Sequence, residues 1–194
     1  MSANVIVVKI GGSLFTQPNL VPRLNKKVDC LSSQYSPAHL VLVTGGGYFV
    51  ESLRKIDQVN EVACEVAHWT AIHLMDINSS LIQKWWAELD SVDSLSELRM
   101  RCKHSGVSLF RVEGFLRHDE PSLAGTQLPV GWEVTSDSIA ARVAEILDAR
   151  QLILLKSVHS ISTQNWDSAA ELGLVDPYFP KIASHLNGTL LDTL

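Results

Sequence analysis

Two glycine-rich loops, each placed directly after a short apolar run, constrain the fold of this chain more than any other feature. The runs, residues 5–10 and Leu40–Val43, are rich in β-branched and aliphatic residues, as are strands buried in parallel sheets. The loops comprise Gly11, Gly12 and Ser13 after the first run and Gly45, Gly46 and Gly47 after the second. Glycines let several backbone N–H groups point at one anion. Two such loops at one edge of a sheet predict two anionic groups held side by side, which is the geometry of transfer between phosphates.

Helical segments alternate with these strands. Sequence compatible with a helix covers Leu20 to about Ser33, and Tyr48–Gln58 places Phe49, Leu53 and Ile56 on one face. This β-α-β-α alternation is typical of a parallel sheet covered by helices. We therefore expect an α/β fold: a three-layer αβα sandwich with a mainly parallel central sheet.

The remainder of the chain continues the alternation up to one long irregular segment. Further helices are predicted at Glu61 to about Leu89, Ser94–His104, Asp137–Ala149, Ala169–Leu174 and Tyr178–Leu186, and further strands at Val107–Val112 and Gln151–Leu155. Thr135 or Ser136 is expected to cap the helix that starts near Asp137. The segment Glu113–Trp132 is irregular, and an irregular segment of this length is more often functional than idle.

Composition excludes several classes of protein. The 194 residues, 46% hydrophobic and 19% charged, fit one domain with a large core. A net charge of −5 without a basic run argues against a nucleic-acid partner. No apolar run approaches the roughly 18 residues of a membrane span, so neither a membrane partner nor a secretory signal is expected. Three separated cysteines form no metal motif, and with no such signal they favour the cytoplasm.

Four segments then occur in an order that resembles the amino acid kinase superfamily. They are Val7–Leu14 (VVKIGGSL), Leu42–Gly47 (LVTGGG), Trp132–Ser138 (WEVTSDS) and Phe179–Lys181 (FPK). The resemblance spans nearly the whole chain. It implies a single kinase-like domain over residues 1–194, in which about 1–130 form the acceptor-side half and about 131–194 form a shortened nucleotide-side half.

The resemblance also implies roles for charged residues. Lys9 resembles the family lysine that reaches the transferred phosphoryl group, and Lys181 matches the second family lysine on the leaving side. Asp137 resembles the aspartate that holds the two lysines in place. Each residue also has an ordinary structural alternative. Lys9 could be a solvated lysine at a strand end, Lys181 a surface lysine, and Asp137 an acid in the first turn of a helix. An ionised acceptor needs no general base, so this set would act by positioning and charge neutralisation.

The two glycine loops take complementary roles in this picture. Gly11, Gly12 and Ser13 would bind the phosphates of ATP. The resemblance assigns Gly45, Gly46 and Gly47 to a place between acceptor and phosphoryl group, before a helix N-terminus that favours an anion. Mg²⁺ is expected as the companion of ATP, with no metal ligand expected from the protein. The long helix from Glu61 is expected to contribute to a homo-oligomer.

One loop departs from the family pattern. Relatives carry an acidic loop containing glycine after the penultimate strand, whereas this chain has Lys156, Ser157, Val158, His159 and Ser160. Lys156 at the end of a strand could replace it as a phosphate ligand, with Ser157 beside it, or could be a plain surface charge. The departure therefore leaves open whether the nucleotide site is intact.

Within the superfamily, the run from Trp132 to Leu155 looks most like the aminomethylfuran phosphate kinase branch of methanofuran and methanopterin-linked C1 metabolism. That branch implies transfer to a phosphate monoester. The alternatives are a nucleoside monophosphate or amino acid kinase of the same family, or a non-catalytic binding protein on the same scaffold. Arg117 and His118 are candidate acceptor ligands, although an exposed loop arginine is the commoner case.

Overall fold

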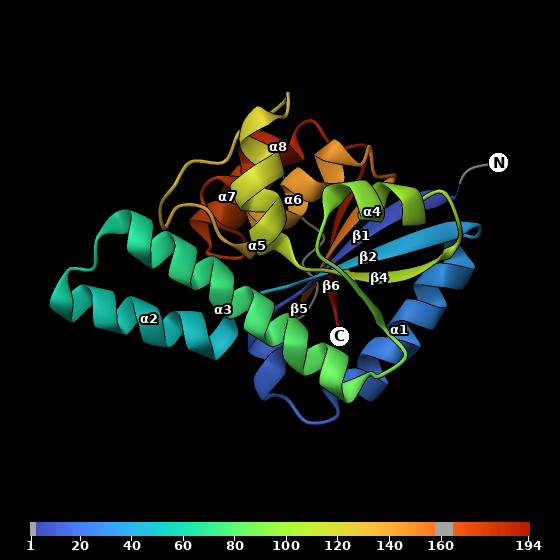
Figure 1. Ribbon diagram of the computed structural model, residues 1–194, viewed down its shortest axis with the longest axis horizontal. Helices are drawn as coiled ribbons and strands as arrows, with labels where there is room; N and C mark the ends of the chain where they lie inside the picture. The colour runs from blue at the N-terminus through green and yellow to red at the C-terminus, as the bar shows by residue number, and fades with distance from the viewer. Residues whose placement is uncertain (1–2, 158–164) are drawn as a thin grey trace.

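The computed structural model describes residues 3–157 and 165–194 (Figure 1). In these residues, six parallel strands form one sheet in the order β3-β4-β2-β1-β5-β6. The strands are β1 (Asn4–Ile10), β2 (Ala38–Thr44), β3 (Asp90–Val92), β4 (Gly106–Phe110), β5 (Gln151–Lys156) and β6 (Thr189–Thr193). The α/β class and the parallel sheet expected from the sequence are confirmed.

Helices connect the strands and form the outer layers. They are α1 (Leu20–Gln34), α2 (Gly47–Asn60), α3 (Cys64–Trp85), α4 (Leu95–Arg101), α5 (Val112–Gly114), α6 (Ser136–Ile146), α7 (Trp166–Glu171) and α8 (Phe179–Ala183), with short helical segments at Gly12–Thr16, Phe115–Asp119 and Glu120–Ser122. Figure 1 shows α1 on one side of the sheet and α4, α6, α7 and α8 on the other.

Side chains of the central strands point alternately to the two faces of the sheet, so the core has two parts. Ile6 and Val8 of β1 pack into the cluster that contains Leu24 of α1. Val7, between them, packs into the other cluster with Ala140 of α6. Successive side chains of a strand point to opposite faces, so a strand covered on both faces must be apolar throughout. This requirement explains the continuous apolar runs in the sequence.

The hairpin of α2 and α3 extends away from the sheet (Figure 1). None of the residues of α2 is fully buried, and Tyr48, Ile56 and Val59 are more than half exposed. Helix α2 therefore contributes little to the central core, whereas α3 places Ile72 and Met75 in one core cluster and Ile82 in the other. The hairpin also forms one wall of the pocket described below.

The structure differs from the sequence expectation at several elements. Strands β3 and β6 were not predicted, because each is short and interrupted by polar residues. The long helix ends at Trp85, before Leu89. The segment expected to be irregular after β4 contains helical turns, including a π-helical turn at Phe115–Asp119. The polar stretch Ser157–Asp167, which follows β5, lies largely outside the described residues.

Candidate phosphoryl-transfer site

The two glycine loops pack directly against each other at the carboxyl ends of β1 and β2. Gly45 N–H donates to Ile10 O at 2.8 Å, which joins the loops at their bases. A Cβ on Gly12 would overlap the backbone nitrogen of Gly47, and Gly47 itself has a φ of +54°. The loops can approach this closely only because neither residue carries a side chain. The predicted adjacency of the loops is therefore present.

A buried asparagine holds the second loop in place. The amide nitrogen of Asn78, on α3, donates to Gly45 O at 2.7 Å and to Gly46 O at 3.0 Å. These bonds fix the backbone of the loop. The first N–H groups of α2 have no partner within that helix, so they remain as donors for an anion. The sequence analysis missed Asn78, whose only signal is a polar residue within a largely apolar helix.

Asp137 lies between two lysines at the base of the pocket. Its Oδ1 is 2.9 Å from Lys9 Nζ, and its Oδ2 accepts from Lys156 Nζ at 2.7 Å. Burial would raise the pKa of Asp137, but the charges of Lys9 and Lys156 hold it below its usual value. Burial and the neighbouring Lys9 charge lower the pKa of Lys156 to about 8, against the attraction of Asp137.

Strand register explains this triad. Lys9 on β1 is paired with Leu154 on the adjacent β5, and Lys156 follows two residues later. Residues two apart share a face, so both lysines point to the side covered by α6, where Asp137 lies in the first turn. The ends of two neighbouring strands and the start of one helix thus bring the three charges together.

Lys181 lies elsewhere. Its side chain is exposed on α8, with the ammonium 4.5 Å from the centre of the Tyr178 ring. The second lysine bound to Asp137 is Lys156, whereas the sequence analysis expected Lys181 there. Of the two alternatives considered for Lys156, a phosphate ligand or a plain surface charge, its position favours the former.

A second buried carboxylate, Asp176, fixes the start of α6. It accepts hydrogen bonds from the backbone N–H groups of Thr135 (3.0 Å), Ser138 (3.0 Å) and Phe179 (3.0 Å), and from both hydroxyls of Thr135 and Ser138. Thr135 occupies the predicted N-cap position, but its hydroxyl binds Asp176 instead of the helix. The sequence analysis missed Asp176, because its partners at the start of α6, Thr135 and Ser138, lie about 40 residues away.

Two serines meet beside the first glycine loop. Ser13 follows β1, Ser157 follows β5, and their hydroxyl oxygens are 2.9 Å apart. The structure therefore brings together two residues that were predicted separately as phosphate ligands. Val158, His159 and Ser160, which belong to the departure from the family pattern, lie outside the described residues.

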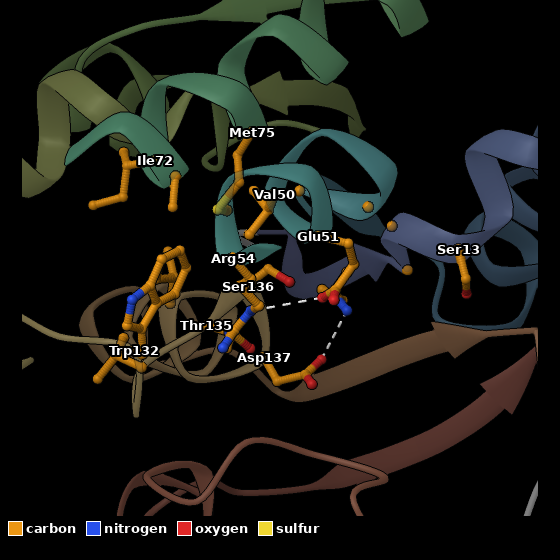
Figure 2. Close-up of a pocket in the computed structure, with 18 of the residues that line it drawn as sticks. Ser13, Val50, Glu51, Arg54, Ile72, Met75, Trp132, Thr135, Ser136 and Asp137 are labelled. Carbon is orange, nitrogen blue, oxygen red and sulfur yellow. Dashed lines mark ion pairs between the residues drawn. The ribbon is translucent and has the colours of Figure 1, made fainter. Parts of the chain in front are cut away.

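The triad of Lys9, Asp137 and Lys156 lines a pocket of about 460 Å³ together with Gly12 and Gly47 of the two loops (Figure 2). In Figure 2, Ser13 and Trp132 lie at opposite ends of the pocket, and Asp137 lies between them. One wall is apolar and includes Val50 of α2 and Ile72 and Met75 of α3. The pocket thus combines a charged centre with an apolar side, which is typical of a small-molecule site.

The far end of the pocket is formed by a loop residue bound to the helical hairpin. Trp132 Nε1 donates to Asp57 Oδ2 at 2.6 Å, and the guanidinium of Arg54 lies 4.3 Å from the centre of the indole ring. Next to Trp132, the N–H of Gly131 donates to Nδ1 of His68 at 3.2 Å. Burial lowers the pKa of His68, which favours the neutral ring. Sequence reasoning missed Arg54, Asp57 and His68.

The loop candidates Arg117 and His118 do not line this pocket. Arg117 pairs with Glu113 at 2.9 Å and lies over the ring of Trp69, 4.1 Å from its centre. His118 lines a separate surface depression with Asp76 and Arg111. The residues that line this end of the pocket are therefore on α2, α3 and the loop before α6.

Comparison with known proteins agrees with this geometry. The sequence model of the amino acid kinase family matches residues 4–172 of this chain. The chain belongs to the amino acid kinase family. Like its relatives in this family, it is an ATP-dependent phosphotransferase.

A curated member of the family is similar over most of this chain. It is [5-(aminomethyl)furan-3-yl]methyl phosphate kinase of Methanocaldococcus jannaschii. The two sequences are 27% identical over 158 residues, which are 80% of this chain and 67% of that protein.

Solved structures of the family share the fold. UMP kinase from Ureaplasma parvum superposes with a TM-score of 0.71 at 14% identity, covering 100% of this chain and 91% of that one. Uridylate kinase from Archaeoglobus fulgidus gives a TM-score of 0.67 at 16% identity, with the same coverage. At these identities the likeness concerns the fold alone.

Proposed function

We propose that this kinase transfers the γ-phosphoryl group of ATP to a small phosphate monoester and forms a diphosphate ester. The observation that carries the proposal is the Lys9–Asp137–Lys156 triad, held on a buried aspartate beneath two adjoining glycine loops. The similarity to a kinase named for a furan phosphate ester supports this acceptor class. On the same basis, we place the enzyme in biosynthesis of a C1-carrying cofactor.

The residues of the pocket have complementary roles in this reaction. Gly11, Gly12 and Ser13 bind the donor phosphates, with Lys156 and Ser157 on the same side. An oxygen of the acceptor phosphate attacks the γ-phosphorus, the bond from that phosphorus to the β,γ-bridging oxygen breaks, and ADP leaves. Lys9 and Lys156 neutralise charge on the transferred group.

Asp137 acts by position. It holds the two lysines apart and in place, and it takes no proton because the acceptor phosphate is already ionised at neutral pH. Its low pKa keeps it charged throughout the range in which the enzyme would work. The second loop, Gly45, Gly46 and Gly47, faces the acceptor phosphate and the group in transit.

Mg²⁺ would enter with ATP. Among residues 3–157 and 165–194, no cluster of three or more His, Cys, Asp or Glu could hold a metal ion. Asp137 already pairs with two lysines, so the residues present offer no protein cage for the ion. Mg²⁺ typically keeps several waters and binds phosphate oxygens. Bound in that way, it would neutralise part of the charge on the donor phosphates.

The assembly and the cellular location also form part of the proposal. The α2–α3 hairpin exposes Tyr48, Ile56, Val59 and Val66, an apolar surface that fits contact with a second copy of the chain. The three thiols are unpaired, as expected in the cytoplasm. In the described part of the chain, no helix is long and apolar enough to cross a membrane. Light scattering of the purified protein tests the oligomer.

The direct test measures ADP release with [5-(aminomethyl)furan-3-yl]methyl phosphate as acceptor. UMP and an amino acid serve as competing acceptors, and Lys9→Ala serves as the inactive control. We expect turnover with the furan ester that exceeds turnover with the other two. Turnover with UMP alone would assign a different acceptor, and ATP binding without turnover on any of them would contradict the kinase reaction proposed here.

A further inference from the structure

The pocket contains a cation that the triad does not use. Lys9 and Lys156 share Asp137, whereas Arg54 lines the opposite end of the same pocket. Donor and acceptor each bring a phosphate, so a reaction between them needs positive charge on both sides. Among the described residues that line the pocket, Arg54 is the one lysine or arginine outside the triad.

Arg54 is weakly paired in the protein itself. Within the described residues, the carboxylate within ion-pair distance is that of Glu51, 3.6 Å from Arg54 Nε and too far for a hydrogen bond. The Glu51 side chain is 67% exposed, so water screens the pair. Arg54 Nε is buried and donates no hydrogen bond to the described residues. The guanidinium therefore retains donors for an anion.

The plane of the guanidinium is nevertheless fixed. It stacks on the indole of Trp132, whose Nε1 is bound to Asp57. Asp57 is itself fixed, because its other oxygen accepts from the N–H of Val62 at 2.9 Å. Arg54 and Asp57 are three residues apart on α2, so they share a face of that helix. The chain Val62–Asp57–Trp132–Arg54 thus links the loop before α6 to the hairpin.

We infer that Arg54 binds the phosphate of the acceptor, and that Trp132, held by Asp57, is the positioning residue that sets the plane of its guanidinium. A fixed plane presents two N–H groups side by side, which matches two phosphate oxygens. The rest of the acceptor then lies along Val50, Ile72 and Met75. This inference rests on the proposed function for its choice of acceptor, but not for the binding of an anion at Arg54.

The first experiment removes the guanidinium and supplies it again from solution. Arg54→Ala should raise the KM for the furan phosphate ester by about 10- to 100-fold, the range for hydrogen bonds to a charged group, with the KM for ATP nearly unchanged. Guanidinium chloride at millimolar concentrations should restore part of the lost activity, because the ion can stack on Trp132. The double variant Arg54→Ala/Trp132→Ala should not be restored.

Conservative variants separate positioning from folding. Arg54→Lys keeps the charge but loses the planar fork, so its acceptor KM should stay high. Trp132→Phe keeps a ring without the Asp57 hydrogen bond and should raise the acceptor KM less than Trp132→Ala. Arg117→Ala is the matched control, because it breaks an arginine–tryptophan stack of similar geometry outside the pocket and should leave both KM values unchanged.

Binding without turnover distinguishes the two proposals. Calorimetric titration with benzyl phosphate should show binding to the wild type and its loss in Arg54→Ala. If the wild type phosphorylates no acceptor but this binding depends on Arg54, the reaction is wrong and the inference stands. Equal binding by both proteins, rescue of the double variant by guanidinium, or an Arg54→Ala defect confined to kcat would overturn the inference.

Discussion

The two ends of the pocket are built in different ways. At the centre of the pocket, Lys9 and Asp137 are buried and Lys156 is partly buried, and the three are closely paired on strand ends and the first turn of a helix. At the end formed with Trp132, which we propose takes the acceptor, Arg54 is partly exposed and pairs weakly, on a helix that buries none of its residues completely. The first arrangement is set by the sheet, and the second by a loop that meets a projecting hairpin.

This difference fits two separate roles, the common reaction at one end of the pocket and recognition of the acceptor at the other. A reaction common to a family needs charges held in one geometry, which a central sheet provides because its strands cannot shift without disturbing both cores. Recognition of a particular acceptor is better placed on loops and projecting elements, which tolerate change. We therefore expect substitutions at the first end to affect the rate, and substitutions at the second to affect the choice of acceptor.

The largest expected effect comes from the two lysines of the triad. Lys9→Ala and Lys156→Ala should each lower kcat by about 10³-fold or more, as does removal of other cations that neutralise a transferred phosphoryl group. Lys181→Ala should have a much smaller effect, because Lys181 is exposed and lies apart from Asp137. Steady-state ADP release measures all three, and a comparable loss in Lys181→Ala would restore the role expected from the sequence.

The next effect is on stability. Asp176→Asn would leave buried N–H and O–H donors of Thr135, Ser138 and Phe179 facing an amide instead of a carboxylate. We expect the free energy of unfolding to fall by about 3 kcal/mol, the scale of lost hydrogen bonds to a charged group. Because the start of α6 carries Asp137, kcat should fall as well. Denaturant unfolding and kinetics measure the two, and unchanged stability would contradict the role given to Asp176.

A pH effect of intermediate size should appear at the nucleotide side. The pKa of Lys156 is about 8, so its positive charge is lost as the pH rises through that value. ATP affinity should therefore decline above about pH 8 in the wild type and stay flat in Lys156→Met. Titrations between pH 7 and pH 10 with an ATP analogue measure this difference, and parallel curves for the two proteins would contradict it.

Loss of the Lys156 proton should lower ATP affinity but raise the stability of the folded protein. The folded pKa of about 8 lies below the ordinary value of 10.5, so between these values the folded protein binds fewer protons than the unfolded chain. The free energy of unfolding should therefore rise with pH across this window, relative to Lys156→Met. A relative decrease, seen in denaturant unfolding at several pH values, would contradict the burial of this ammonium group.

The smallest expected effect concerns the serine pair. Ser13→Ala removes a hydrogen bond to Ser157 that is exposed to solvent, so stability should change by less than about 1 kcal/mol. ATP affinity should fall only a few-fold, because the glycine loop supplies other donors. Calorimetric titration measures the affinity, and a loss as large as that of Lys9→Ala would move the serine into the group of essential charges.

The sequence predicted the parts of the molecule that depend on local pattern. The apolar runs before Gly11 and Gly45 had to be buried strands, and the helices between them had to cover a parallel sheet. Lys9 and Asp137 were found because each occurs within a recognisable segment. Neither β3 nor β6 was found, because short polar strands carry little local signal and form only beside a strand already in place.

The sequence by itself thus determined the layers of the fold and the two glycine loops, since strand period, helix period and glycine freedom are local properties. The resemblance of two segments to the amino acid kinase superfamily indicated Lys9 and Asp137. Only the tertiary structure decided that Lys156, and not Lys181, completes the triad, because this depends on β5 lying beside β1 in a particular register. It also decided that Trp132 meets Asp57, 75 residues away along the chain. Such contacts depend on how elements pack, and packing is a property of the whole chain.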